Sequence, residues 1–331
     1  MAIRVYDPFE KAHFNPQTCF LTGQTLHTSE EQTSIFPDWV LERYSLGDKT
    51  FKMLEEGSIV RYKDLKIPCA KEVIEKVLNP LEEEIEKAFA GGYEEVIKVP
   101  EERLFQWMAK LVYGILYEDL NIAKRKLEER RESFSLSKFL QGRFKKLHFM
   151  LQSLVVPMEF TGIKPWTIRV VKVKYSKDVF NYKDETNNLN FSLGMNDFGI
   201  VACLQDNGMV GKSQEAIIKK IGNKTLHPIQ FEELCSRFIY TNYLLNSYAE
   251  YTVQANDEKI LIESVPLVAK ANKPLSEPWD DTMFAQVLAS YWRPWGLTMS
   301  QIITFPNPPI SYLEDDYSHE LIAMDSIPLP Y

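Results

Sequence analysis

The sequence predicts an α+β protein with a mostly helical N-terminal part and a C-terminal part that contains strands. Apolar residues recur at helical spacing through residues 35–150, whereas β-branched and aromatic residues in partial alternation appear beyond about residue 155. The 331 residues are 45% hydrophobic and 12% aromatic, which is typical of a globular protein. We therefore predict domains 1–120 and 151–331, joined by a basic helical connector over 121–150.

Two helices are marked most clearly in the N-terminal part. Asn79 and Pro80 precede three glutamates, which indicates a helix start because Asn caps, Pro fits the first turn and carboxylates favour the positive end of the dipole. Gly91-Gly92 marks the end of this helix. A second helix follows Pro100, and its apolar residues at helical spacing should be buried. They are Leu104, Trp107, Met108, Leu111, Val112, Ile115 and Leu116.

The C-terminal part alternates predicted strands and helices. A β-branched run predicts a strand over 166–175, and two short apolar runs around a turn predict a hairpin. The hairpin strands are 190–194 and 199–204, followed by a helix over 231–248, a strand over 260–268, a helix over 283–292 and a last strand over 296–305.

The charge balance, the cysteines and the hydropathy of the segments indicate which classes of protein are excluded. Acidic residues outnumber basic ones, 46 to 38, which argues against a surface that grips nucleic acid throughout. The N-terminus has no apolar core of a signal peptide, and no stretch approaches the roughly 18 apolar residues of a membrane span. Four scattered cysteines then indicate reduced thiols. We predict a cytoplasmic protein without a membrane partner.

A spaced set of residues in the first third resembles a known family. Cys19 precedes Ser29-Glu-Glu31-Gln32, then Ile35-Phe-Pro-Asp-Trp39, then Cys69 and a helix with Leu81-Glu82. The later helix with Trp107 and Lys110 completes the pattern. Over roughly residues 13–120 the chain is similar to bacterial proteins with an HNH-type core, the ββα-metal nuclease fold. The resemblance implies a scaffold held together by a structural zinc ion, a metal-dependent endonuclease activity and a role in phage defence.

The residues present supply only part of that chemistry. Structural zinc takes about four thiolate or imidazole ligands, and this stretch offers Cys19 and Cys69, with Gly23 and Glu72 near the partner positions. Without more ligands, we predict no metal and treat the two thiols as small buried residues. The alternative is zinc at Cys19 and Cys69, with magnesium at the catalytic centre.

Gln32 stands where the resemblance implies a histidine that activates water. An amide does not accept a proton at neutral pH, so we predict no catalytic residue. The alternative is a substituted site made of His27, Glu31 and Gln32, in which a register shift brings His27 into use. Carboxylates at the start of a helix, such as Glu31, are more often capping and solvated groups.

Two further features suggest contact with a partner. Residues 124–146 are the most basic part of the chain and could contact phosphates, although interspersed glutamates also suit a solvated charged helix. The basic candidates are Lys124, Arg125, Lys126, Arg130, Arg131, Arg143, Lys145 and Lys146. The aromatic cluster could stack on bases, receive a protein or pack in the core. It consists of Trp279, Tyr291, Trp292 and Trp295, with Arg293.

We therefore expect a non-catalytic interaction or scaffold protein derived from an HNH-like fold, attached to a nucleoprotein or larger assembly. The apolar tail 327–331 supports this expectation, because it needs either a partner or a groove of its own chain to cover it. The alternative is a metal-dependent HNH-family nuclease with substituted catalytic residues. Binding of RNA through residues 124–146 is a weaker third hypothesis.

Overall fold

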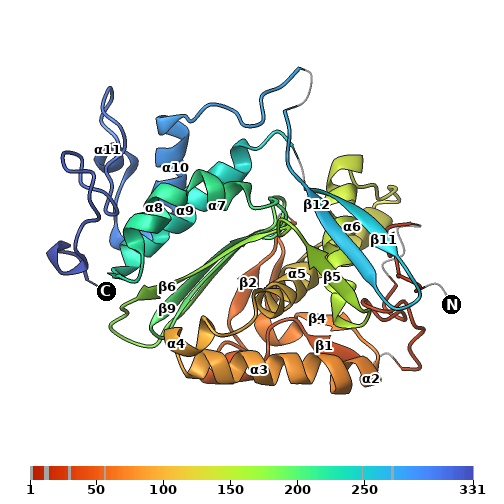
Figure 1. The fold of residues 1–331 in the computed structure, drawn as a ribbon. Coiled ribbons are helices and arrows are strands. Elements are labelled where there is room, and N and C mark those ends of the chain that lie inside the picture. The colour runs from red at the N-terminus through yellow and green to blue at the C-terminus, as the bar shows by residue number, and fades with distance from the viewer. Residues whose placement is uncertain are drawn as a thin grey trace. The chain divides into compact units, whose positions relative to one another are not determined.

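Helices and open sheets together make up the fold, which confirms the predicted α+β class (Figure 1). The computed structural model describes residues 3–10, 15–28, 31–55, 57–247, 249–269 and 272–330. The chain forms two compact units. Unit 1 contains Met1–Ala88, Val99–Thr161 and Val253–Ile262, and unit 2 contains Phe89–Lys98, Gly162–Thr252 and Glu263–Tyr331. Unit 1 thus combines most of the predicted segments 1–120 and 121–150 with a short piece of the third.

Unit 1 contains short strands and the longest helix of the described chain. Its strands are β1 (Gln32–Ser34), β2 (Thr50–Lys52), β3 (Ile59–Arg61), β4 (Lys66–Pro68) and β5 (Met158–Thr161). Its helices are α1 (Asp38–Arg43), α2 (Lys71–Val73), α3 (Asn79–Ala90), α5 (Glu101–Glu129) and α6 (Lys138–Leu151). β1 pairs with β4, and β2 pairs with β3, both antiparallel. β5 is an edge of a three-stranded sheet with β12 (Ile260–Val265) in the centre and β11 (Glu250–Ala255) beyond it.

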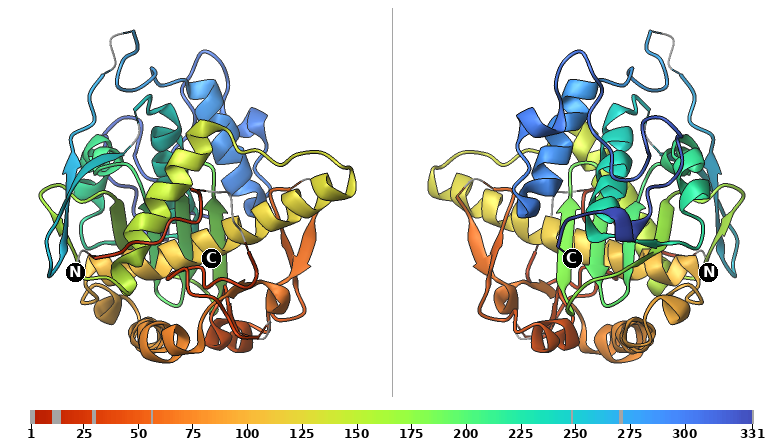
Figure 2. Two further views of the ribbon diagram at one scale, coloured as in Figure 1. Left: turned by 90° about the vertical axis from the view of Figure 1, so that its right-hand side faces the viewer. Right: turned by 90° about the vertical axis from the view of Figure 1, so that its left-hand side faces the viewer.

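The prediction that residues 35–150 are mostly helical is wrong between α1 and α2. That stretch holds β2, β3 and β4, each only three residues long, which is too short to display an alternating pattern. An aromatic cluster fixes the β2–β3 hairpin, because the ring of Phe51 lies 5.7 Å from that of Phe36 and 5.3 Å from that of Tyr62. In Figure 2 this hairpin lies beside the C-terminal half of α5, where Asp119 accepts a hydrogen bond from the Leu54 amide.

The two helices predicted most clearly are confirmed. α3 ends at Ala90, and Gly92 beyond it has φ of 73°. Asn79 is not a cap, however, because α2 continues through a π-helical turn (Ile74–Leu78) and leaves Asn79 with helical angles. α5 buries all seven apolar residues predicted for its core face. Among the described residues, each helix is too short or too polar to span a bilayer.

Gly114 of α5 is required by a close approach to Ile35. A Cβ atom at Gly114 would lie 2.9 Å from Cγ1 of Ile35, so Gly114→Ala should destabilise unit 1 by about 1–2 kcal/mol despite its better helix propensity. Gly142 of α6 has nothing within 4 Å of the same position, so Gly142→Ala should stabilise by about 0.5–1 kcal/mol. Urea denaturation measures both. Equal effects of the two substitutions would contradict the tight Gly114–Ile35 contact.

Unit 2 is built around a five-stranded sheet. Its strands are β6 (Thr167–Val173), β7 (Phe180–Glu185), β8 (Asn190–Met195), β9 (Phe198–Cys203) and β10 (Thr225–Leu226), in the order β10-β6-β9-β8-β7. Its helices are α4 (Tyr93–Val96), α7 (Met209–Ser213), α8 (Glu215–Ile221), α9 (Pro228–Leu244), α10 (Asp281–Trp292) and α11 (Met299–Ile302). The predicted hairpin is confirmed as β8–β9, and the predicted strand 166–175 as β6.

Helix α9 covers one face of this sheet (Figure 1). The ring of Phe231 lies against Gly199 so closely that a Cβ atom there would be 2.4 Å from it. The helices predicted over 231–248 and 283–292 are confirmed as α9 and α10. The predicted last strand over 296–305 is wrong. A capping box at Thr298 with Gln301 starts α11 instead.

The apolar tail packs against the core of unit 2, so its own chain covers it, which was one of the two alternatives predicted for it. Ile327 is buried, and the indole of Trp295 donates to the carbonyl of Pro330 over 3.1 Å. His227 caps α9 through Nδ1, which accepts from the Ile229 amide, so Nε2 carries the proton and donates to the Leu329 carbonyl over 3.0 Å. Within the described chain the tail therefore gives no support for an external partner.

Candidate functional site

A pocket of about 470 Å³ lies where β1, the start of α1, α3 and α5 converge in unit 1. The antiparallel strands β1 and β4 precede the helical run α2–α3 in the chain, with α1, β2 and β3 between the two strands. The side chains lining the pocket include Gln32, Asp38, Lys66, Asn79, Glu82, Glu83, Glu86 and Lys110. Six residues quoted for the family resemblance thus line one pocket. They are Gln32, Pro37, Asp38, Trp39, Glu82 and Lys110.

A buried ammonium group ties the walls of this pocket together. The Lys110 side chain is 2% exposed, and its Nζ donates to the carbonyls of Ser34 and Ile35, each over 2.8 Å, and to Glu82 Oε1 over 2.9 Å. The other oxygen of Glu82 accepts from the indole of Trp107 over 3.1 Å. All three ammonium hydrogens are therefore used, and the pair links α5 to α3 and to the end of β1.

Gln32 is exposed on β1 and lines the pocket. The alternative catalytic residues do not gather around it. His27 is exposed, and its backbone amide donates to Glu31 Oε1 over 2.8 Å, as does that of Thr28 over 3.1 Å. These bonds lower the pKa of Glu31. Glu31 therefore closes a turn, although not as the predicted helix cap, because α1 starts at Asp38. Ser29 and Glu30 lie outside the described residues.

Two acidic side chains of the pocket already have hydrogen-bond partners within unit 1. Glu82 is committed to Lys110 and Trp107, and Asp38 accepts from the Ser34 hydroxyl over 3.2 Å. No group of three histidine, cysteine, aspartate or glutamate side chains in the described part of the chain is placed to hold a metal ion. We therefore derive no step through magnesium at this pocket.

The structure brings Cys19 and Cys69 together. The amide after Cys19, that of Phe20, donates to the carbonyl of Pro68 over 2.9 Å. The two side chains are hydrogen-bonded to each other, and both residues are fully buried. The bond from Cys69 is the main cause of a lowered pKa at Cys19, aided by the Ala70 amide, whereas the same contact and burial raise the pKa of Cys69.

This pair of thiols does not fit structural zinc. A tetrahedral site needs two more strong ligands, and the third residues after each cysteine are Thr22 and Glu72. Thr22 offers a hydroxyl that hydrogen-bonds Cys19, and Glu72 is 67% exposed and pairs with Lys76 over 2.7 Å. At the positions where the resemblance implies further zinc ligands, Thr22 and Glu72 therefore make hydrogen bonds with other side chains of the protein.

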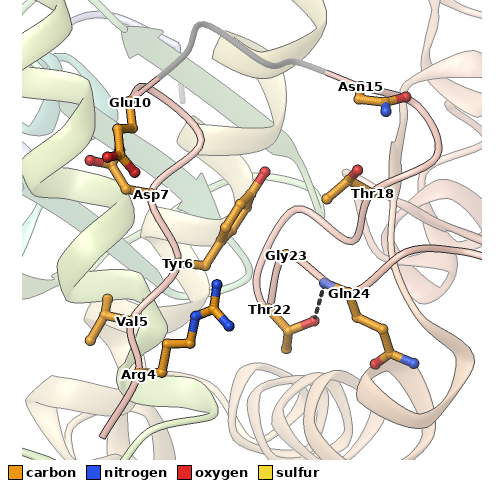
Figure 3. Close-up of a pocket in the computed structure, with 10 residues that line it drawn as sticks. All are labelled: Arg4, Val5, Tyr6, Asp7, Glu10, Asn15, Thr18, Thr22, Gly23 and Gln24. Atoms are coloured by element: carbon orange, nitrogen blue, oxygen red, sulfur yellow. Dashed lines mark hydrogen bonds between the residues drawn. The ribbon is translucent and has the colours of Figure 1, made fainter. Parts of the chain in front are cut away.

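A larger pocket, of about 780 Å³, borders the loop that carries Cys19 (Figure 3). Thr18, Thr22, Gly23 and Gln24 line it from the loop, and Arg4 and Tyr6 point toward them from the N-terminal segment. A Cβ atom at Gly23 would lie 2.4 Å from the Tyr6 ring, and Gly23 has φ of 72°, so glycine is required twice over. Sequence spacing gave no sign of this pocket, because residues near Tyr6 carry no motif.

Most of the basic candidates in residues 124–146 have acidic or aromatic neighbours. Lys124, Arg125 and Lys126 pair with Glu128, Glu118 and Glu55 over 3.8, 3.1 and 3.2 Å. Lys145 pairs with Asp7, and Arg143 is buried with its guanidinium 5.5 Å from the Phe139 ring centre. Arg130 and Arg131 are exposed at the end of α5. The pairing favours the solvated charged helix, while nucleic-acid contact stays a prediction.

The aromatic cluster divides between core and surface in unit 2. Trp292 and Tyr291 are buried, whereas Trp279 is 41% exposed. Its ring lies 4.6 Å from that of Tyr240, which stacks on Tyr243 at 6.4 Å, and Tyr243 is 61% exposed. The sequence prediction missed Tyr240 and Tyr243 because they lie on α9, about 40 residues before Trp279.

No family model, no curated protein and no solved structure matches this chain. The functional argument therefore depends on the site itself.

Proposed function

We propose that the protein is a non-catalytic binding protein that keeps the frame of an HNH-like core and lacks its hydrolytic chemistry. The observation that carries the proposal is Gln32, an exposed amide on β1 beside the buried Lys110–Glu82 pair. An amide cannot act as the general base that a nuclease needs to activate water. The frame supports the ancestry, because Glu82, Trp107 and Lys110 are the positions through which the helices resemble that family.

An exposed aromatic surface in unit 2 supports a binding role. Tyr243, Trp279 and Met283 are 61%, 41% and 42% exposed. The rings of Tyr243 and Trp279 lie against buried Tyr240, and Met283 precedes buried Phe284 on α10. We call these three exposed residues the aromatic surface. Aromatic and methionine side chains are enriched at protein interfaces, and clustered exposed apolar residues mark such sites. The aromatic surface is thus a better candidate than the docked tail.

The charges around the aromatic surface select its partner. Asp281 accepts from the Trp279 indole over 3.0 Å, and Glu277 and Asp280 lie in the same segment. A rim of carboxylates repels phosphates and attracts lysine and arginine. The expected partner is therefore a protein with an apolar centre and a basic rim, and a nucleic acid is disfavoured at this surface.

A nicking assay tests the absence of hydrolysis. The purified protein should leave supercoiled plasmid intact with magnesium, manganese or nickel. The fraction of plasmid that stays supercoiled should be the same with a Glu31→Ala variant. Cleavage that disappears in His27→Ala or Glu31→Ala, while persisting in an exposed control such as His319→Ala, would overturn the non-catalytic proposal and support the substituted nuclease. The same preparation should also be free of nucleic acid at low salt.

Photo-crosslinking tests the binding role. A photoreactive phenylalanine analogue at Tyr243 should crosslink in cells to a discrete protein, and Trp279→Ala should reduce the yield at least tenfold. The matched control places the analogue at Tyr317, which is 95% exposed but outside the aromatic surface. Equal yields from both positions, crosslinks to nucleic acid, or none at all would contradict the proposal. The crosslinked protein should carry lysine or arginine near the site of attachment.

A further inference from the structure

Two loops of unit 1 bring the thiols of Cys19 and Cys69 into contact. Among the described residues, no group of three histidine, cysteine, aspartate or glutamate side chains is placed to hold a metal there. The Cys19 loop is closed by its own backbone, since the Cys19 amide donates to Gln24 O over 2.8 Å and the Gly23 amide donates to Cys19 O over 3.0 Å. The Cys69 loop is anchored separately, because the Cys69 amide donates to Glu31 O over 3.0 Å. The bond from Phe20 to Pro68 joins the two loops. The contact between the sulfurs is therefore built into the backbone.

The surroundings of Cys19 favour a thiolate. The contact with the Cys69 side chain lowers the pKa of Cys19 most, and hydrogen bonds with the backbone of Ala70 and Leu21 and with Thr22 lower it further, whereas burial raises it. Cys69 keeps its proton, because its pKa is raised by the contact with Cys19 and by burial. A thiolate in contact with a thiol is the pair that forms a disulfide after oxidation of the first sulfur.

The 780 Å³ pocket brings solvent up to the loop that carries Cys19. Both cysteines are fully buried, but Thr22 bonds Cys19 on one side and lines the 780 Å³ pocket on the other (Figure 3). Gly23 and Thr18 continue the same wall of the pocket. Hydrogen peroxide is small enough to reach the loop through the pocket, whereas a protein oxidant is not.

We propose that Cys19 and Cys69 are a reversible redox site, which forms a disulfide when the protein meets hydrogen peroxide. The Cys19 thiolate attacks one peroxide oxygen, the O–O bond breaks, and hydroxide leaves and takes a proton to form water. Cys69 then loses its proton and attacks the Cys19 sulfenic acid, the S–S bond forms, and the second oxygen leaves as water. Two thiols and one peroxide thus give one disulfide and two waters, and a dithiol reductant reverses the reaction by exchange.

Intact-protein mass spectrometry and thiol counting test the proposal. Limited peroxide treatment of the folded protein should remove ~2 Da and two of the four free thiols, and dithiothreitol should restore both. Peptide mapping should find Cys19 joined to Cys69. This reaction should run at least about tenfold faster than oxidation of Cys203 or Cys235, which are buried elsewhere in the chain.

Three variants separate this site from general oxidation. Cys69→Ser should stop disulfide formation and leave Cys19 as a sulfenic acid, a gain of ~16 Da that dimedone traps. Cys19→Ser should abolish fast oxidation, and Cys235→Ser should leave the reaction unchanged. Circular dichroism checks that each variant is folded.

Other outcomes would overturn the proposal. These are no loss of two thiols from the folded protein, a disulfide with a different pairing, and an unchanged rate in Cys19→Ser. One zinc ion per chain in the purified protein, lost in both Cys19→Ser and Cys69→Ser, would also overturn it and restore the metal interpretation.

Discussion

Lys110→Met should lower the free energy of unfolding by about 3–5 kcal/mol, the largest effect that we expect from one substitution in unit 1. The change removes the ammonium that satisfies Glu82 Oε1 and the carbonyls of Ser34 and Ile35. A carboxylate left beside a buried apolar chain costs far more than the lost ion pair alone, because it has no compensating charge. Urea denaturation followed by tryptophan fluorescence measures the loss.

Lys124→Met is the matched control on the same helix. Lys124 is about one-third exposed and pairs loosely with Glu128, so its replacement should cost at most about 0.5 kcal/mol. A Glu82→Met change should rescue part of the stability of Lys110→Met, because it removes the uncompensated charge. If Lys110→Met lowers the free energy of unfolding no more than the control does, the Lys110 ammonium does not stabilise the packing of α5 against α3 and β1.

Acidification from pH 7.5 to pH 4.5 should destabilise unit 1 by roughly 2–3 kcal/mol through His148 alone. Burial lowers the pKa of His148 to about 4, against an ordinary value of 6.5. Its Nε2 lies 2.6 Å from the Phe20 carbonyl and donates to it, and Nδ1 accepts from Gln152 over 3.3 Å, so the folded protein holds the neutral ring. The unfolded chain takes up the proton below pH 6.5. Stability therefore falls as the pH drops from 6.5 toward 4.

Denaturation curves of His148→Gln test this assignment. The variant should be less stable than the parent at pH 7.5, but it should lose about 2–3 kcal/mol less on acidification. His27→Gln serves as the control, since His27 is exposed, and it should keep the full pH dependence of the parent. The lowered pKa of His227 adds a smaller loss of the same sign in unit 2. Identical pH slopes for His148→Gln and the parent would show that another group is responsible.

Long elements were predictable because their periodicity is repeated many times. α5 carries seven apolar residues at helical spacing, and β8–β9 combines two apolar runs around a turn. One residue that departs from either pattern therefore does not hide it. The three-residue strands β2, β3 and β4 have no period to detect. Aromatic contacts between residues 36, 51 and 62 hold the β2–β3 hairpin, and β4 is held by pairing with β1. The position of the tail and the helical conformation of α11 likewise depend on tertiary contacts and on a capping box, which periodicity does not reveal.

The site was predictable only where residues could be matched to a motif. The motif singled out Cys19, Cys69, Glu82 and Lys110, and the structure brings them into two pairs within unit 1. It did not indicate that hydrogen bonds within the protein would occupy the polar groups of each pair. Some of the partners, such as the Ser34 carbonyl, are backbone atoms that a sequence motif does not specify. The aromatic surface was hidden for a different reason, since it joins residues that are distant in the chain.

The docked C-terminal segment has a consequence for any peptide-recognition module that reads apolar and proline residues. Ile327-Pro-Leu-Pro330 has the composition of a short linear ligand, yet the carbonyls of Leu329 and Pro330 are occupied by His227 and Trp295. A module that captured this peptide would first have to release it, so its apparent affinity would fall by the fraction of molecules in which the segment is free. Trp295→Phe, which removes one of the two anchors, should therefore make the peptide easier to capture.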